Sequence, residues 1–158
     1  MPQARCLILA CGNTLREDDG VGPWLAEWTQ SRFAGEPRVR VLTQHQWTPE
    51  LAQDLAQAET VLFVDCATDA APGEVRVDPV EVAQAVGPGL GTHHLGAAEL
   101  LRLTKELYDA VPRSALLLTV GAGSLELREG FSEAVQAALP LACVRLEKAV
   151  LQLLATAI

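Results

Sequence analysis

Residues 6–22 of the chain, "CLILACGNTLREDDGVG", carry the clearest signal of its fold class. They begin with an uninterrupted apolar run, which is typical of a strand buried on both faces of a sheet. Beyond Gly20 the apolar residues recur at helical intervals, and Gly20 and Gly22 would let the backbone turn tightly and the helix approach the sheet. A strand that enters a helix through a short turn is the first half of a β-α-β unit, so this stretch predicts a parallel sheet.

The rest of the chain repeats this alternation of apolar strands and helical patterns. Further strands are expected at 38–44, at 60–65 ending in Asp65, at 73–80 on a sheet edge, and at 114–123. Further helices are expected at 48–58 with Thr48 as N-cap, at 95–110, and at 132–154 with a break or new start near Pro140. This order predicts one α/β domain over residues 1–158: a three-layer sandwich with a mostly parallel, twisted sheet of about five strands and helices on both faces.

Composition limits the classes of function. The 158 residues suit one domain, and 20 acidic against 12 basic residues give a formal net charge of −8. General binding to nucleic acid or to an anionic membrane needs a basic face, so neither is expected. No segment begins with a basic patch followed by a long apolar signal region, and no apolar run reaches the ~18 residues of a membrane span, so the cytoplasm is the expected location. The four cysteines form no C-x-x-C pair and are expected to be buried free thiols.

The candidate functional residues follow the predicted strands. Function collects at the carboxyl ends of the strands in an open α/β sheet. Asp19 follows the first strand, Asp65 ends the third, and His93 and His94 precede the helix at 95–110. Two aspartates and one histidine suit either a divalent metal ion of the late first row or a general acid–base site, and the sequence leaves both open.

The neighbours of these residues have simpler interpretations. Asp18 is expected to support the turn and the start of the helix, and Glu17 is expected to be a solvated neighbour. His45 ends the second strand and is expected to be structural. No G-x-S-x-G elbow is present, and no cysteine lies in a visibly electropositive setting, which argues against a serine or cysteine nucleophile.

Three motifs, taken in order, resemble the hydrogenase maturation proteases. The first is Gly12-Asn13, four residues, then Asp18-Asp19, a small residue, any residue and Gly22. The second is the aspartate that closes the apolar run of "VLFVDCA" (61–67), and the third is the "HHLG" that opens a helix (93–96). The resemblance covers nearly the whole chain in order and length.

The resemblance implies an endopeptidase that trims the C-terminal extension from the large-subunit precursor of a nickel-iron hydrogenase. The family's metal-binding and catalytic set falls on Asp19, Asp65 and His93, and His93 is preferred to His94 because the family pattern is His-x-Leu-Gly. The nickel would arrive with the precursor, its protein partner, so no permanently bound cofactor is expected. Two alternatives stay open: a metal-sensing chaperone that does not cut, and a metal-independent hydrolase that uses Asp19 and Asp65.

The stretch "QHQWTPEL" (44–51) follows the second strand, where many members of the family carry a glycine-rich turn. It makes Gln46, Trp47 and Thr48 candidates for substrate selection. The alternative for Trp47 is a partly buried packing residue.

Overall fold

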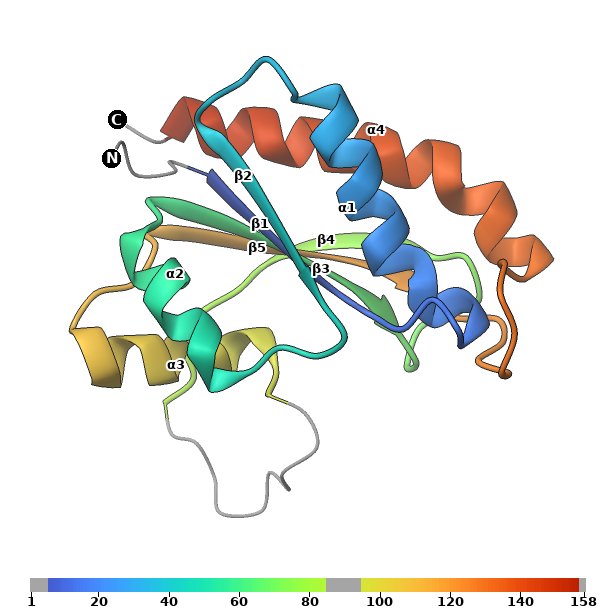
Figure 1. The fold of residues 1–158 in the computed structure, drawn as a ribbon, viewed down its shortest axis with the longest axis horizontal. Helices are drawn as coiled ribbons and strands as arrows, with labels where there is room; N and C mark the ends of the chain where they lie inside the picture. Colours follow the sequence, from blue (N-terminus) through green and yellow to red (C-terminus); the bar gives the residue numbers. More distant parts are fainter. Residues whose placement is uncertain (1–5, 85–94, 157–158) are drawn as a thin grey trace.

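A computed structural model of the protein describes residues 6–84 and 95–156. One five-stranded sheet forms its centre, with strand order β2-β1-β3-β5-β4. The first four strands in this order pair in parallel, and β4 pairs antiparallel with β5 at an edge (Figure 1). The strands are β1 Cys6–Cys11, β2 Val39–Gln44, β3 Thr60–Ala67, β4 Val75–Pro79 and β5 Ser114–Gly121. The predicted mostly parallel α/β sheet, including its edge strand at 73–80, is confirmed.

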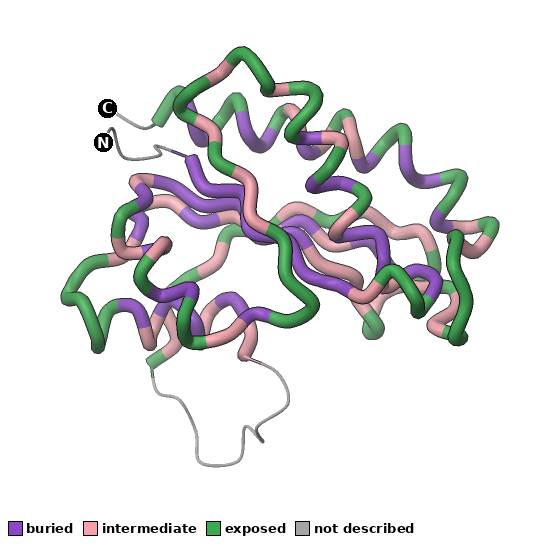
Figure 2. Tube along the Cα trace, in the orientation of Figure 1, coloured by how far each residue is buried: buried purple, intermediate pink, exposed green. Residues whose placement is uncertain are grey.

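Helices cover both faces of the sheet, which makes the three predicted layers. The helices α1 (Val21–Arg32) and α4 (Glu133–Thr156) lie on one face, while α2 (Ala52–Gln57) and α3 (Ala97–Tyr108) lie on the other (Figure 1). Each face has its own hydrophobic core, and the central strands are buried between them (Figure 2). All six residues of β1 are buried, as the apolar run predicts.

The turn after β1 brings α1 directly against the sheet. A Cβ atom added at Gly22 would lie 2.1 Å from the carbonyl oxygen of Cys11, a separation that no side chain tolerates. Glycine at this position therefore permits the close contact between α1 and β1, as the sequence predicts.

Two predicted helices differ from their observed forms. The helix α4 continues through Pro140 without a break, because apolar residues before and after the proline, such as Leu139 and Ala142, are buried in the core. The helix predicted at 48–58 begins as the 3-10 turn η2 (Pro49–Leu51) and becomes α-helical only in α2. Thr48 occupies the N-cap position but makes no capping hydrogen bond with its side chain.

The strand β3 runs two residues past its predicted end. Its pairing with β5 continues from Asp65 opposite Thr119 to Ala67 opposite Gly121. Asp65 therefore lies inside a strand and is held by the sheet. In the described parts of the chain, no helix combines the length and the apolar character that crossing a membrane requires.

Candidate active site

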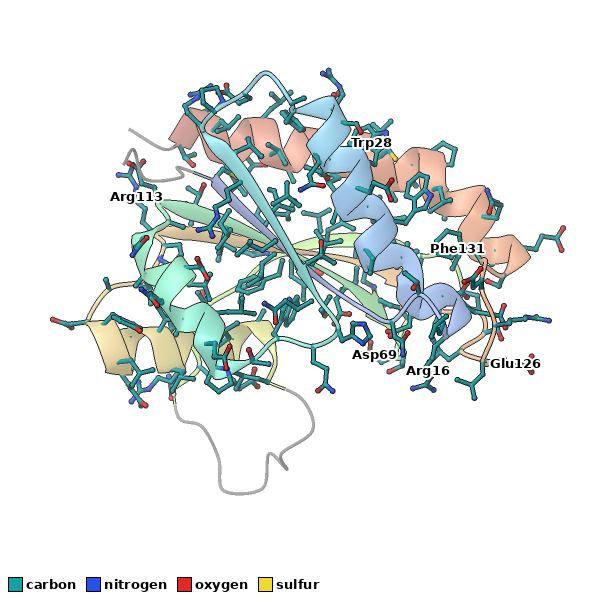
Figure 3. All side chains as sticks on the ribbon, in the orientation of Figure 1. Arg16, Trp28, Asp69, Arg113, Glu126 and Phe131 are labelled. Atoms are coloured by element: carbon teal, nitrogen blue, oxygen red, sulfur yellow. The ribbon has the colours of Figure 1, made fainter. Side chains whose placement is uncertain are left out.

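A cavity of about 540 Å³ opens at the carboxyl ends of β1, β2 and β3. This is the edge of the parallel sheet at which function was expected. Figure 3 places Arg16 and Asp69 at this end of the molecule and Arg113 at the opposite end. The cavity, called the cleft below, is lined by Cys11, Gly12, Asn13, Arg16, Asp19, His45, Gln46, Trp47, Asp65, Cys66, Thr68, Leu95, Gly96 and Leu125.

Asp19 reaches the cleft from the short 3-10 helix η1 (Glu17–Gly20), which follows β1. The backbone N–H of Asn13 donates to Oδ2 of Asp19 at 2.7 Å and fixes the orientation of the carboxylate. Gly12 makes this tight turn possible, because its φ is +150° and a Cβ atom there would lie 1.9 Å from the carbonyl oxygen of Asp19. The turn therefore presents one half-buried carboxylate to the cleft.

Asp65 reaches the cleft from β3, beside Cys11 of β1. The parallel register pairs Ala10 with Val64, so the next residue of each strand lies alongside the other. The thiol of Cys11 donates to Oδ1 of Asp65 at 3.3 Å, and the backbone N–H of Cys66 donates to the same oxygen at 2.8 Å. The Asp65 carboxylate is thus held in place by its own strand and by the neighbouring one.

The two thiols of the cleft are not activated nucleophiles. Burial, with the negative charge of Asp65, raises the pKa of the Cys11 thiol far above its ordinary value. Burial, with the charges of Asp19 and Asp65, raises the pKa of Cys66 to about 12. Both groups therefore stay protonated at neutral pH, and Cys11 serves as a hydrogen-bond donor.

The third residue of the expected set, His93, lies outside the described residues, as does His94. Leu95 and Gly96, which follow them directly, line the cleft. Across residues 6–84 and 95–156, no three side chains of His, Cys, Asp or Glu come together in a way that could hold a metal ion. The described part of the cleft therefore contributes two carboxylates of the expected set.

The three candidates for substrate selection lie in different positions. Gln46 is exposed and lines the cleft. Trp47 is only 7% exposed, and its ring packs edge-on against Phe63 with the centroids 5.1 Å apart, so it is a packing residue that also lines the cleft. Its Nε1 atom is buried and has no hydrogen-bond partner among the described residues. Thr48 is half-buried and does not line the cleft.

Asp18 supports the turn after β1, as predicted, but it does not cap α1. Its carboxylate is fully buried and accepts from the backbone N–H groups of Gly123, Ser124 and Ser132 at 2.7, 2.9 and 2.7 Å. The Ser132 hydroxyl donates to it as well, at 2.7 Å. Burial alone would raise the pKa of Asp18, but these hydrogen bonds outweigh burial and hold the pKa below its ordinary value. Asp18 therefore ties the turn after β1 to the start of α4.

Glu17 is not a solvated residue, since it is only 3% exposed. The hydroxyl of Ser124 donates to its carboxylate at 2.6 Å, and Arg128 forms an ion pair with it at 2.9 Å. The hydrogen bond from Ser124 and the pairing with Arg128 hold the pKa of Glu17 below its ordinary value. Glu17 and Asp18 together anchor the segment that follows β5.

Sequence reasoning missed several residues that line the cleft. His45 was expected to be structural, yet it is exposed and lies in the cleft wall, as do Arg16, Cys11 and Cys66. The available signal was position, because Cys11 and His45 stand at the carboxyl ends of β1 and β2 just as Asp65 stands near that of β3.

Comparison with known proteins gives a consistent result. A family model described as hydrogenase maturation protease matches residues 24–149. The maturating endopeptidase HybD of Escherichia coli superposes with a TM-score of 0.75 at 23% identity, covering 94% of this chain and 93% of that one. A hydrogenase 2 maturation peptidase from a Thaumarchaeota archaeon gives 0.66 at 27% identity, covering 92% and 97%. The [NiFe] hydrogenase maturation protease HycI of Thermococcus kodakarensis gives 0.66 at 25% identity, covering 92% of each chain.

None of the curated proteins compared with the chain matches it. The family model nevertheless spans most of the chain, from the first turn of α1 into α4. The chain belongs to the hydrogenase maturation protease family.

Proposed function

We propose that this protein is an endopeptidase that removes the C-terminal extension of a nickel-loaded large-subunit precursor of a nickel-iron hydrogenase. The observation that carries the proposal is that Asp19 and Asp65, from two different elements, both line one cleft at the carboxyl edge of the sheet. Membership of a protease family supports hydrolysis of a peptide bond as the reaction. We place this activity in the cytoplasm.

The nickel belongs to the substrate in this proposal. Asp19, Asp65 and His93 would contact it, since carboxylate and imidazole groups both suit a divalent ion of this kind. A set of only three protein ligands leaves positions for the precursor's own ligands and for water. Bound nickel would supply Lewis-acid chemistry at the scissile carbonyl.

The chain's own residues hold the two carboxylates ready. The Asn13 N–H orients Asp19, and Cys11 and the Cys66 N–H orient Asp65, so neither carboxylate has to be ordered when the substrate arrives. One of these carboxylates would accept the proton of the attacking water. Gln46 and the ring of Trp47 would contact the substrate from the β2 side of the cleft, and Thr48 would act only by shaping this segment.

The test uses purified precursor loaded with nickel. Incubation with the protein should convert the precursor to a shorter form, seen as a gel shift and as a single new C-terminus by mass spectrometry. Asp19→Asn and His93→Ala should keep the fold, checked by circular dichroism, and stop the conversion. Normal cleavage by either variant would contradict the assignment of these residues.

Two further outcomes separate the alternative functions. A stable complex without cleavage would identify a metal-sensing chaperone. Equal cleavage of precursor prepared with a nickel chelator present throughout would identify a metal-independent hydrolase that uses Asp19 and Asp65.

A further inference from the structure

A second cavity lies beside the cleft, on the other side of the turn after β1. It has a volume of about 310 Å³, at the lower end of the range for small-molecule sites, so it suits a single long side chain. Residues of the turn line the two cavities alternately. Asn13, Arg16 and Asp19 line the cleft. Thr14, Glu17 and Gly20, the next residue in each case, line the second cavity. The second cavity, called the acidic pocket below, is lined by Thr14, Glu17, Gly20, Pro23, Trp24, Glu27, Glu129, Gly130 and Phe131.

Two aromatic rings form a wall of the acidic pocket. Trp24 comes from the first turn of α1 and Phe131 from the segment before α4, and their rings meet edge to face with centroids 6.4 Å apart at 85°. Figure 3 places Phe131 and Glu126 at the same end of the molecule as Arg16. Trp24 is 37% exposed, which leaves part of a large ring available to a ligand. The exposed face of an indole ring attracts cations.

The charge of the acidic pocket is unbalanced. Three of its lining residues are glutamates, and none is basic. Arg128 pairs with Glu17, but neither Glu27 nor Glu129 forms an ion pair with any residue that the structure describes. Two exposed carboxylates beside an exposed indole ring suit a guanidinium or ammonium group, and the planar guanidinium of arginine suits both partners best.

Exposed apolar side chains lie on the two segments beside the acidic pocket. The segments around Arg16 and Arg128 run side by side, joined by a parallel bridge between these two residues. The residues just before them, Leu15 and Leu127, are 56% and 83% exposed. Exposed apolar side chains on two neighbouring segments add apolar area that a protein ligand would be able to contact. Arg16 and Leu125 of the same two segments line the cleft, so this surface is continuous from the cleft to the acidic pocket.

We propose that the acidic pocket binds an arginine or lysine side chain of the protein substrate while the segment to be cut lies in the cleft. The identity of this partner rests on the proposed function, because a protein seated in the cleft would reach the acidic pocket across the turn after β1. The acidic pocket would then act as a second point of recognition that selects the substrate without touching the bond that breaks.

The pocket is tested first with small probes that need no cleavage. N-acetyl-arginine amide and its neutral analogue N-acetyl-citrulline amide are titrated into the protein while the indole N–H resonance of Trp24 is followed by NMR. The arginine probe should bind at least about fivefold more tightly than the citrulline probe, and Glu27→Gln/Glu129→Gln should remove this difference. Equal binding of both probes, or an unchanged preference in the variant, would overturn the proposal.

The second experiment measures cleavage of nickel-loaded precursor at low and high salt. Glu27→Gln/Glu129→Gln should raise KM about tenfold at low salt, with little change in kcat and a weaker salt dependence. Glu106→Gln/Asp109→Asn, at the far end of α3, removes the same charge and should leave KM unchanged. Equal KM values for the two variants would contradict the proposal. A Glu27→Gln/Glu129→Gln variant whose oligomeric state changes while its KM does not would contradict it as well. If the wild type cuts no precursor, the proposed function fails, while the probe titration still decides whether the pocket binds a basic side chain.

Discussion

Asp18 and Asp19 are adjacent in one turn, but their carboxylates lie in different environments. The carboxylate of Asp18 is buried under four hydrogen bonds, while that of Asp19 faces the cleft and accepts one from Asn13. The 3-10 geometry of η1 turns consecutive side chains in different directions, so Asp18 fastens the turn and Asp19 faces the cleft. A hydrogen-bonded anchor beside the candidate metal-binding carboxylate limits how far that carboxylate can move.

Replacing Asp18 by Asn should destabilise the protein by about 1.5–3 kcal/mol at pH 7, because a buried charged acceptor of backbone N–H groups is lost. The folded-state pKa of Asp18 is lowered, so its contribution is present above the unfolded-state pKa of about 3.9 and is lost as pH falls through the lower folded-state value. Urea unfolding from pH 7 to pH 3 measures this. The difference in unfolding free energy between the wild type and Asp18→Asn should become smaller below about pH 4. The exposed Asp69→Asn is the control. A difference that stays constant over this range would contradict the assignment.

Gly22 is the second position where one residue determines the geometry of the site. An alanine there would place its Cβ atom 2.1 Å from the Cys11 carbonyl oxygen, so α1 would have to move away from β1. Gly22→Ala should therefore cost about 1–3 kcal/mol of unfolding free energy, as overpacked cores do. Gly35→Ala is the matched control, since no atom lies within 4 Å of a Cβ atom there. Equal stability of the two variants in urea would show that the contact at Gly22 is not tight.

At the scale of elements, the helix α4 depends on tertiary packing more than on local propensity. Pro140 has no N–H to donate to the preceding turn, yet the helix continues because nine of its residues are buried against the sheet and α1. Burial of one face of α4 thus compensates for the hydrogen bond that Pro140 cannot donate on its exposed face.

Replacing Pro140 by Ala should stabilise the protein by about 1–2 kcal/mol. The gain of a helical hydrogen bond and of helix propensity exceeds the entropy that proline removes from the unfolded chain. Thermal unfolding followed by circular dichroism measures the change, and Gln136→Ala, on the same helix, controls for helix propensity alone. An unchanged or lower stability of Pro140→Ala would mean that the proline fits α4 without strain.

The sequence predicts the elements well because their signals are local. The apolar run of β1 and the helical spacing after Gly20 follow from burial and periodicity within a few residues. The anchoring roles of Glu17 and Asp18 were not predictable, because their partners lie 105 to 114 residues away along the chain. The hydrogen bond between Cys11 and Asp65 was not predictable for the same reason. It depends on the register between β1 and β3, which local sequence patterns do not reveal.

In the whole molecule, the fold brings Asp19 and Asp65, which are far apart in the sequence, to the same end of the sheet. The cleft and the acidic pocket both lie around the turn after β1, whereas Arg113 lies at the other end of the molecule (Figure 3). The net charge of −8 would favour approach of a basic partner surface to such an acidic region. The candidate site therefore forms where residues from different elements meet at the carboxyl ends of the strands, and no single motif contains it.

If the cleft carboxylates take part in peptide hydrolysis, as we propose, removing the charge of Asp65 should stop cleavage without unfolding the protein. The rate constant for cleavage of nickel-loaded precursor is measured at saturating enzyme for the wild type, Asp65→Asn and the exposed control Asp78→Asn, with unfolding free energies recorded for all three. Asp65→Asn should stay folded and cut at least about a hundredfold more slowly, while Asp78→Asn should cut at the wild-type rate. Cleavage by folded Asp65→Asn at the wild-type rate would contradict the proposal.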